Sequence, residues 1–268
     1  MARKKQILTL LMTSLALVSL TGCTHQQAKP TKTELTKQKT ELKEKQHEDN
    51  VKNVVNKVIK DNITSGHTSQ TIKVNNITSN LNGDFSAVTG LLNMKLSVNK
   101  PQPVTNEYWY QTITRGKSNK YTMYARTKGM TNWQKRNIKA QQDQLSAQSR
   151  NINTQKAIWA QMANRNPELI NIKQTNDGYE LTIKNSAKSR KAIQSVLNLN
   201  NQGSNSTVTK AQLSVNADKM GVPAFMHMTL NSKQGNKVIH SDQTFMQINQ
   251  RNQLKLPKSV TKNAKLIK

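Results

Sequence analysis

The chain is poor in cysteine, aromatic residues and acidic residues. It has one Cys in 268 residues, and Phe, Trp and Tyr together account for 4% of the chain. A single thiol cannot form an internal disulfide, so a disulfide-stabilised scaffold is excluded. Asp and Glu number 14 against 41 Lys and Arg, which gives a formal net charge of +27. Two features therefore need an explanation: the position of the one cysteine and the excess of positive charge.

The N-terminus predicts a secretory signal peptide. Residues 3–5 are Arg-Lys-Lys, and residues 7–20 are apolar apart from small hydroxyl residues. This apolar stretch is shorter than the roughly 20 residues of a stable membrane-spanning helix, and a small-residue site follows it directly. We expect residues 1–22 to be a signal peptide that is removed, and not a transmembrane helix.

The cysteine stands at the end of this segment. Leu20, Thr21 and Gly22 directly precede Cys23, and the four residues resemble the lipobox of bacterial lipoproteins. The resemblance implies that the Cys23 thiol carries a diacylglyceryl group and becomes the first residue of the mature chain. Two acyl chains hold a protein on a bilayer, whereas one gives only reversible attachment. The expected location is the outer face of the cell membrane, and the alternative is an accidental thiol in a discarded leader.

Residues 23–50 predict a lipidated cysteine followed by a polar, flexible tether. The segment consists mainly of Lys, Glu, Gln and Thr and has no aromatic residue. Residues 32–35, Lys-Thr-Glu-Leu, recur as residues 39–42, a spacing of seven. A coiled coil needs two apolar positions per heptad over three or four heptads, whereas this repeat offers one leucine. We therefore expect a solvated tether with at most transient helical structure.

Helical periodicity appears in three later segments. In residues 51–63, Val and Ile recur at helical spacing with Lys and Asn between them, which predicts an amphipathic helix packed on its own sheet. Residues 137–167 lack alternation and contain a sparse apolar line, Leu145, Ile152, Trp159 and Met162, that ends before Asn166-Pro167. Residues 186–197 predict a third, shorter helix. All three could cover one face of a sheet.

Alternating apolar and polar residues predict strands elsewhere between residues 51 and 268. In residues 91–99, Leu-Leu-Asn-Met-Lys-Leu-Ser-Val-Asn, the apolar residues share one face and the polar residues share the other. The predicted strands are residues 71–78, 87–99, 107–115, 120–127, 169–174, 179–184, 208–217, 224–232 and 237–250. The predicted turns are residues 82–84, 115–117, 128–129, 176–178, 218–223 and 234–236. The expected fold is α+β, with a single curved antiparallel sheet and a few helices.

The order of these elements resembles a family of surface lipoproteins of Gram-positive bacteria. The segments that carry the resemblance are KYTMYARTKGMTNWQKR, GYELTIKN, AQLSVNADKMGVPAFMHMTLN and TFMQINQRNQLKLPKSVTKNAKLI. Proposed relatives of that family are the LolA/LolB carriers and the LppX/LprG lipoproteins. The resemblance covers residues 51–268 and implies a LolA/LppX-like half-barrel of antiparallel strands, with helices on its concave face and an apolar cavity that holds acyl chains.

Methionine and leucine on the predicted strands are candidates for the lining of such a cavity. The chain has 10 Met, whose flexible thioether suits both loose packing and lipid contact. The candidate residues are Leu92, Met94, Leu96, Tyr121, Met123, Met226, Met228, Leu230, Met246 and Ile248. The same residues would also fill an ordinary dry core. The low aromatic content favours the dry core, because ligand cavities are usually lined with apolar and aromatic side chains.

The positive charge predicts contact with anions outside the membrane. Removal of the leader leaves 38 Lys and Arg against 14 acidic residues, a net charge of +24. No basic run is interleaved with stacking aromatic residues, so we do not expect nucleic acid as a partner. Anionic wall polymers and lipid headgroups are the anions available there, and a solvated basic surface suited to a negatively charged wall is favoured over specific binding of one of them.

Enzymatic chemistry has little support in the sequence. The five histidines, His25, His47, His67, His227 and His240, are scattered, and no zinc-binding or nucleophile motif includes them. His227 and His240 lie on neighbouring predicted strands, but two histidines do not make a metal site. We expect no enzyme, cofactor or metal. Two functions remain open: a carrier that holds a lipid in a half-barrel cavity, and a basic surface module that binds anionic wall polymers or a partner protein.

Overall fold

The computed structural model describes residues 32–199, 206–262 and 264–267. Contacts divide the chain into two compact units, Met1–Lys43 and Glu44–Lys268, and the second unit contains the sheet. The predicted signal peptide, the lipobox residues Leu20, Thr21 and Gly22, and Cys23 lie outside the described residues. Within the part of the chain that the structure describes, no helix has both the length and the apolar character needed to cross a membrane.

The second unit contains a 12-stranded open sheet whose pairs are antiparallel, apart from one parallel pair between β12 and β6. The strands are β1 (Ser65–Val74), β2 (Ile77–Ser86), β3 (Leu91–Val98), β4 (Val104–Arg115), β5 (Ser118–Thr127), β6 (Gln134–Ile138), β7 (Ile170–Gln174), β8 (Gly178–Ile183), β9 (Thr207–Asp218), β10 (Pro223–Gln234), β11 (Lys237–Met246) and β12 (Lys265–Leu266). Their order is β12-β6-β5-β4-β3-β2-β1-β11-β10-β9-β8-β7. The predicted α+β fold with one large, mostly antiparallel sheet is confirmed.

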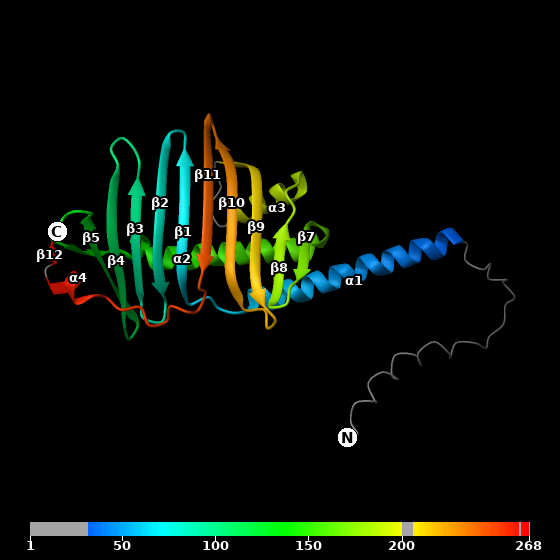
Figure 1. Ribbon diagram of the computed structural model, residues 1–268, viewed down its shortest axis with the longest axis horizontal. Helices are drawn as coiled ribbons and strands as arrows, with labels where there is room; N and C mark the ends of the chain where they lie inside the picture. The colour runs from blue at the N-terminus through cyan, green and yellow to red at the C-terminus, as the bar shows by residue number, and fades with distance from the viewer. Residues whose placement is uncertain (1–31, 200–205, 263, 268) are drawn as a thin grey trace, which may run out of the picture. The chain divides into compact units, whose positions relative to one another are not determined.

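The pairing of β1 with β11 joins the two halves of the sheet. Strands β1 to β6 form a meander, and strands β7 to β11 form another, so each strand mostly lies beside its neighbour in sequence. The contact between β1 and β11, in cyan and orange in Figure 1, joins the two meanders, and the pairing of β12 with β6 is the other one between strands distant in the sequence. Phe245 of β11 faces Thr68 of β1 and Met226 of β10 in this register. The strand pair near the centre of the sheet therefore has the largest separation in sequence.

The helices are α1 (Lys32–Lys60), α2 (Gln144–Arg165), α3 (Ala187–Leu199) and α4 (Lys258–Lys262), with short 3-10 turns at Ala140–Gln142 and Pro167–Leu169. Helix α2 crosses the strands on one face of the sheet (Figure 1). It begins after Asp143, whose carboxylate accepts hydrogen bonds from the backbone N–H groups of Leu145 and Ser146. It ends before Asn166-Pro167, as predicted. We call the sheet face that packs against α2 the inner face.

The structure differs from the expected flexible conformation of residues 32–50, because α1 already begins at Lys32, while the role of residues 23–50 as a tether stays a prediction. Lys, Glu, Gln and Leu are good helix formers, so this sequence can extend a helix that is fixed further along. The fixed part is the predicted amphipathic segment. There Val51, Val54, Val55 and Val58 are buried in the core. Between residues 44 and 50 the side chains are exposed, apart from a half-buried Glu48.

The core lies between the inner face and the helices. Ile158, Trp159 and Met162 of α2 are almost fully buried together with Leu92 of β3 and Phe245 of β11. The four apolar residues predicted for α2 are all buried. Removal of a side chain as large as Trp159 from such a core typically costs about 3–5 kcal/mol of stability. The packing of α2 therefore contributes strongly to the sheet's stability.

The first hairpin was not predicted. Residues 71–78 do not form one strand, since β1 ends at Val74 and β2 begins at Ile77, with Asn75 at a φ of 53° in the turn. Residues 82–84, predicted as a turn, lie inside β2 instead. A Cβ at Gly83 would lie 2.0 Å from the carbonyl oxygen of Asn93. Glycine is needed here for close approach of β3, and not for a chain reversal.

The end of the sheet around β6 also differs from the prediction. Residues 134–138 form β6, so the predicted helix begins at Gln144 and not at Asn137. The C-terminal segment adds α4 and β12, and β12 pairs with β6. Val260 of α4 packs with Tyr124 and Trp133 in a second, small core cluster. Local patterns did not indicate these elements because each is short and depends on its neighbour.

Candidate functional site

The strand register decides which predicted cavity residues share a face. Eight of them lie on the inner face: Leu92, Met94, Leu96, Tyr121, Met123, Met226, Met228 and Leu230. Ile248 follows β11 and is buried in the same core. Met246 was wrongly placed, because it pairs with His67 and Phe225 on the outer face while its neighbour Phe245 points inward. Nine of the ten side chains therefore lie on the inner face or in its core, whereas their role as the lining of a cavity stays a prediction.

These residues differ in their exposure along the strands. Leu92 and Met94 of β3 and Met226 and Met228 of β10 are buried in the core. Further along the same two strands, Leu96 and Leu230 are only half-buried. The inner face is therefore filled beside the helices and open toward one end of the strands.

The open part of the inner face carries a strip of apolar side chains that Ser79 and Ser241 interrupt. Residues paired directly across neighbouring strands form rows. One row, from β4 to β10, consists of Val104, Val98, Ser79, Ile72, Ser241 and Leu230. The next row, closer to the turns, contains Ile77, Val74 and Ile239. We call these apolar side chains, with Leu81 and Leu96 behind them, the apolar strip. All are half-buried or exposed, and Ile77 and Val104 are 48% and 38% exposed. At about 4.8 Å per strand, the strip is roughly 24 Å wide from β4 to β10.

Buried amides limit the strip on the side of α2. Gln243 shares a row with Leu81 and Leu96, and its Oε1 accepts a hydrogen bond of 3.4 Å from Nε2 of Gln155 in α2. Nε2 of Gln243 and Oε1 of Gln155 are buried without a partner among the described residues. Such groups cost about 1–3 kcal/mol each. The apolar strip therefore ends at a polar layer under the helix.

Sequence analysis found only two members of the strip, Leu96 and Leu230. The others were missed because they lie at strand ends, where a predicted boundary is uncertain by several residues. Ile72 and Val74 continue the period-two pattern of β1, and Ile77 repeats it after the turn. Correct placement of the first hairpin would have revealed them. Their proximity to Val98 and Ile239 depends on strand pairing and has no local sequence pattern.

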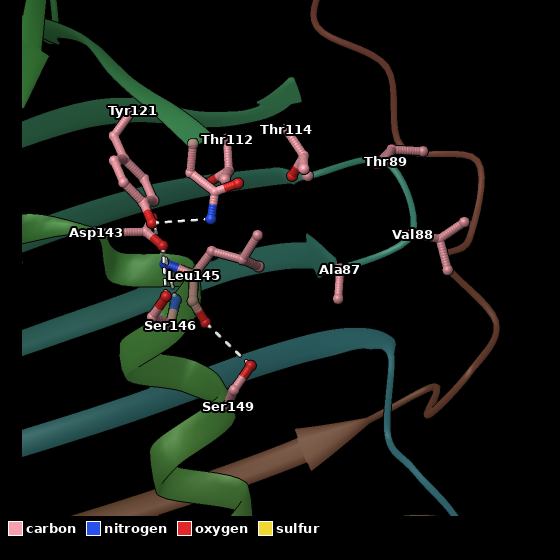
Figure 2. Close-up of a pocket in the computed structure, with 12 residues that line it drawn as sticks. Ala87, Val88, Thr89, Thr112, Thr114, Tyr121, Asp143, Leu145, Ser146 and Ser149 are labelled. Carbon is pink, nitrogen blue, oxygen red and sulfur yellow. Dashed lines mark hydrogen bonds between the residues drawn. The ribbon is translucent and has the colours of Figure 1, made fainter. Parts of the chain in front are cut away.

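A pocket lies at the opposite end of the strands. It is a pocket of about 440 Å³ between the turn of residues 87–90, the β4–β5 hairpin and the start of α2. Figure 2 shows that hydroxyl groups line it, from Thr89, Thr112, Thr114, Tyr121, Ser146 and Ser149. Oδ2 of Asp143 accepts a 2.6 Å hydrogen bond from the Ser146 hydroxyl, and Nδ2 of Asn119 donates to the Tyr121 hydroxyl. Asp143 is engaged in capping α2, so it is not poised as a catalytic base.

The histidines of the sheet lie on the outer face and have separate partners. His67 Nδ1 lies 2.8 Å from Asp84 Oδ1, and His227 Nε2 lies 2.9 Å from Asp242 Oδ2. His240 contacts Asn231 instead. The described residues contain no cluster of three or more metal-ligating side chains. His227 and His240 lie on neighbouring strands, but His227 pairs with Thr244 and His240 pairs with Asn231, so the register does not bring the two histidines opposite one another.

Asp242 is the outer-face carboxyl whose pKa is most clearly shifted. Partial burial alone would raise its pKa, but hydrogen bonds from His227 and Thr229 and the nearby charge of His240 together hold the pKa below its ordinary value. A lowered pKa keeps this carboxylate ionised, and an ionised carboxylate is a better acceptor for both partners. The arrangement stabilises the β10–β11 pair and leaves the carboxylate without a free reactive role.

The two ends of the strands differ in charge. At one end, four turn segments (residues 73–78, 99–105, 127–132 and 232–238) carry five lysines and no acidic residue. We call this end, with Lys73, Lys100, Lys128, Lys233 and Lys237, the lysine edge. The opposite end, which we call the aspartate edge, carries Asp61, Asp84, Asp143, Asp177 and Asp218 together with several basic residues. The apolar strip lies at the lysine edge, and the hydroxyl-lined pocket lies at the aspartate edge.

No protein-family model matches this chain, and no curated protein matches its sequence. The resemblance to Gram-positive surface lipoproteins therefore stays a prediction. The site must be interpreted from its own geometry and charge.

Proposed function

We propose that the protein is an exported lipoprotein, anchored to the outer face of the membrane through Cys23, that binds one apolar chain of a lipid on the apolar strip. The observation that carries this proposal is the strip itself, with Ile72, Leu96 and Leu230 half-buried on the inner face. In this proposal the sheet curves around its helices as a half-barrel, and the ligand occupies the concave side that the helices leave open.

The burial pattern favours a narrow lipid-binding surface over a large cavity. The inner face beside α2 is occupied by Trp159 and Met162, so a ligand has no room there without displacing the core. On the strip, each square ångström of apolar surface that a ligand removes from water is worth about 25 cal/mol. Soluble proteins rarely leave large connected apolar patches open unless these bind something. An extended acyl chain across several strands would fit this surface.

The lysine edge adds a second feature that suits a lipid. Lys73 and Lys237 stand at the ends of the same strands that carry Val74 and Ile239. A lipid with an anionic headgroup could place its chain on the strip and its headgroup among these ammonium groups. Lysine binds phosphate as a flexible point charge and does not demand a fixed geometry.

The proposal is tested by mass and by uptake. The mature chain with Cys23→Ser, which removes the acyl anchor, would be purified gently, and its native mass compared with its denatured mass. We expect an excess mass that extracts into organic solvent, and uptake of an added fluorescent fatty acid. Ile72→Gln should reduce the uptake strongly. Met220→Gln is the matched control, because Met220 is 74% exposed at the aspartate edge. Equal masses and no uptake would contradict the proposal.

A second function is favoured by the charge. Residues 44–268 contain 33 Lys and Arg against 12 Asp and Glu, a net charge of +21. Such a field attracts anionic polymers. The corresponding proposal is a basic surface module that holds wall polymers or an acidic partner protein. It predicts binding that salt abolishes, with no lipid uptake by the same preparation.

A further inference from the structure

We propose that the lysine edge is a membrane-docking surface that binds reversibly to an anionic bilayer, independently of any acyl group on Cys23. This goes beyond lipid binding on the apolar strip, because it assigns a contact between the folded sheet and the membrane itself. The proposal rests on the geometry, the charge and the exposed apolar side chains of the four turn segments.

The strand register brings the lysines to one edge. Lys73 pairs with Thr78 and with His240, so the β1–β2 turn stands beside β11. Lys237 pairs with Gln234 at the β10–β11 turn. On the other side, Oδ1 of Asn99 accepts a 2.7 Å hydrogen bond from the backbone N–H of Thr78, which places Lys100 next to the first hairpin. The backbone N–H of Lys128 donates to Thr105 at 2.8 Å, so the row extends to β5.

All five lysines are exposed, and in the described part of the chain none of them forms an ion pair. No Asp or Glu occurs in the four segments that carry them. Their positive field is therefore not neutralised within the edge. Unpaired ammonium groups on one edge are what an anionic surface attracts.

Exposed apolar residues stand among these lysines. Ile77 is 48% exposed, Val238 is 50%, Met130 is 60% and Val104 is 38%. One of them lies in each of the four segments. Apolar side chains flanked by lysine are typical of surfaces that insert into the boundary between headgroups and acyl chains. The aliphatic stems of the lysines can add to this contact while their ammonium groups remain at the headgroups.

This composition favours a bilayer over a hydrophilic polymer. A polymer of sugars and phosphates would pair with the lysines but would gain nothing from Ile77 or Val238. A bilayer gains from both kinds of side chain. Ile77 and Val104 also belong to the apolar strip, so docking would bring the open end of the strip against the membrane. A role for the strip at the membrane rests on the proposed lipid binding, whereas docking of the lysine edge does not.

The test uses the mature chain with Cys23→Ser and vesicle co-sedimentation. We expect binding to vesicles of phosphatidylcholine with phosphatidylglycerol, weakening with salt, and little binding to phosphatidylcholine alone. The variant Lys73→Gln/Lys100→Gln/Lys237→Gln should lower the binding constant about tenfold or more. The control Lys117→Gln/Lys139→Gln/Lys219→Gln removes the same charge at the aspartate edge and should have a much smaller effect. Equal losses in the two triple variants would overturn the proposal.

A second pair of variants separates the bilayer from a polymer. Ile77→Ser/Val238→Ser should weaken vesicle binding about tenfold and leave binding to soluble polyphosphate unchanged. Unchanged vesicle binding would overturn bilayer docking and favour an anionic polymer. Thermal unfolding of each variant verifies that it is folded. Lipid uptake by the Cys23→Ser chain without further substitutions distinguishes the two proposals. Uptake without vesicle binding contradicts only this inference, and vesicle binding without uptake contradicts only the carrier function.

Discussion

The lysine edge and the aspartate edge carry similar numbers of basic residues but differ in their acidic ones. At the aspartate edge, Asp143 caps α2, Asp218 holds the turn before β10, and Asp84 contacts His67. At the lysine edge no acidic residue is present in the turns. Asp143 and Asp218 therefore satisfy backbone N–H groups and Asp84 a histidine side chain, and the charge difference between the edges comes from the positions of these acids. The lysine edge is therefore positive mainly because its turns contain no acidic residue.

The largest expected effect is the loss of Asp143. Its carboxylate is 3% exposed and accepts hydrogen bonds from two backbone N–H groups and from the Ser146 hydroxyl. Asp143→Ala should lower the free energy of unfolding by about 3 kcal/mol, because buried donors lose their acceptor. Urea unfolding measures this. Asp143→Asn keeps the acceptor oxygen and should recover part of the loss; a change below about 0.5 kcal/mol in Asp143→Ala would contradict the structural role of this aspartate.

The buried Tyr110 should make the free energy of unfolding depend on pH. Burial, then the charges of Tyr108 and Asp143, raises the pKa of Tyr110 from 10.0 to about 12. A raised pKa means that the stabilisation is complete below pH 10 and is lost as pH rises toward 12. The expected loss over that range is roughly 2 kcal/mol. Tyr110→Phe should be less sensitive to this rise in pH. Absorbance titration of tyrosinate should show a late step that Tyr110→Phe removes, although burial also raises the pKa of Tyr124. An ordinary titration of every tyrosine would contradict the assignment.

The turn at Asp218 should contribute less. Oδ1 of Asp218 accepts from the backbone N–H groups of Met220 and Val222 at 2.8 and 2.9 Å, and all three residues lie toward solvent. Asp218→Ala is expected to destabilise the protein by about 1 kcal/mol. Asp218→Asn keeps the acceptor and should be nearly neutral. If Asp218→Asn lowered the free energy of unfolding as much as Asp218→Ala, the charge of Asp218 and not its hydrogen bonds would be responsible for the stabilisation.

The smallest effect on stability is expected at the lysine edge. Lys73→Gln and Lys237→Gln should each change the free energy of unfolding by less than about 0.5 kcal/mol, since exposed lysines without ion pairs contribute little to the fold. Their effect should appear in binding instead. A destabilisation comparable to that of Asp218→Ala would show that these lysines have structural contacts and would weaken the contrast between the edges.

Much of the fold followed from local pattern. The valines of α1, the apolar line of α2 and most strands were predicted because helical and strand periods differ clearly. Predictions failed where the type of a residue is required by contact with a neighbouring strand or by a turn. Gly83 resembles a turn residue, but its small size is required by the backbone of Asn93. Asn75 begins the reversal inside residues 71–78, and the adjacent polar pair Asn75-Asn76 is the one break in the alternation of that run.

The site was predicted only in part, for a similar reason. Met246 and Ile248 appear to share a face if β11 continues to residue 250. The strand ends at Met246, and Gln247 and Asn249 adopt φ values of 50° and 61°. These left-handed residues redirect the chain, so Ile248 enters the core while Met246 stays outside. No periodic pattern could indicate this change.

The sequence by itself determined which side chains of most strands point together, which segment of α1 is buried, and how strongly positive the protein is. Only the tertiary structure decided which part of the inner face the helices cover and which turns meet at one edge. The physical reason is the pairing of β1 with β11, which joins Val74 to Ile239 across most of the chain. Local periodicity specifies a face, whereas the contact between distant strands specifies which faces and edges become a surface.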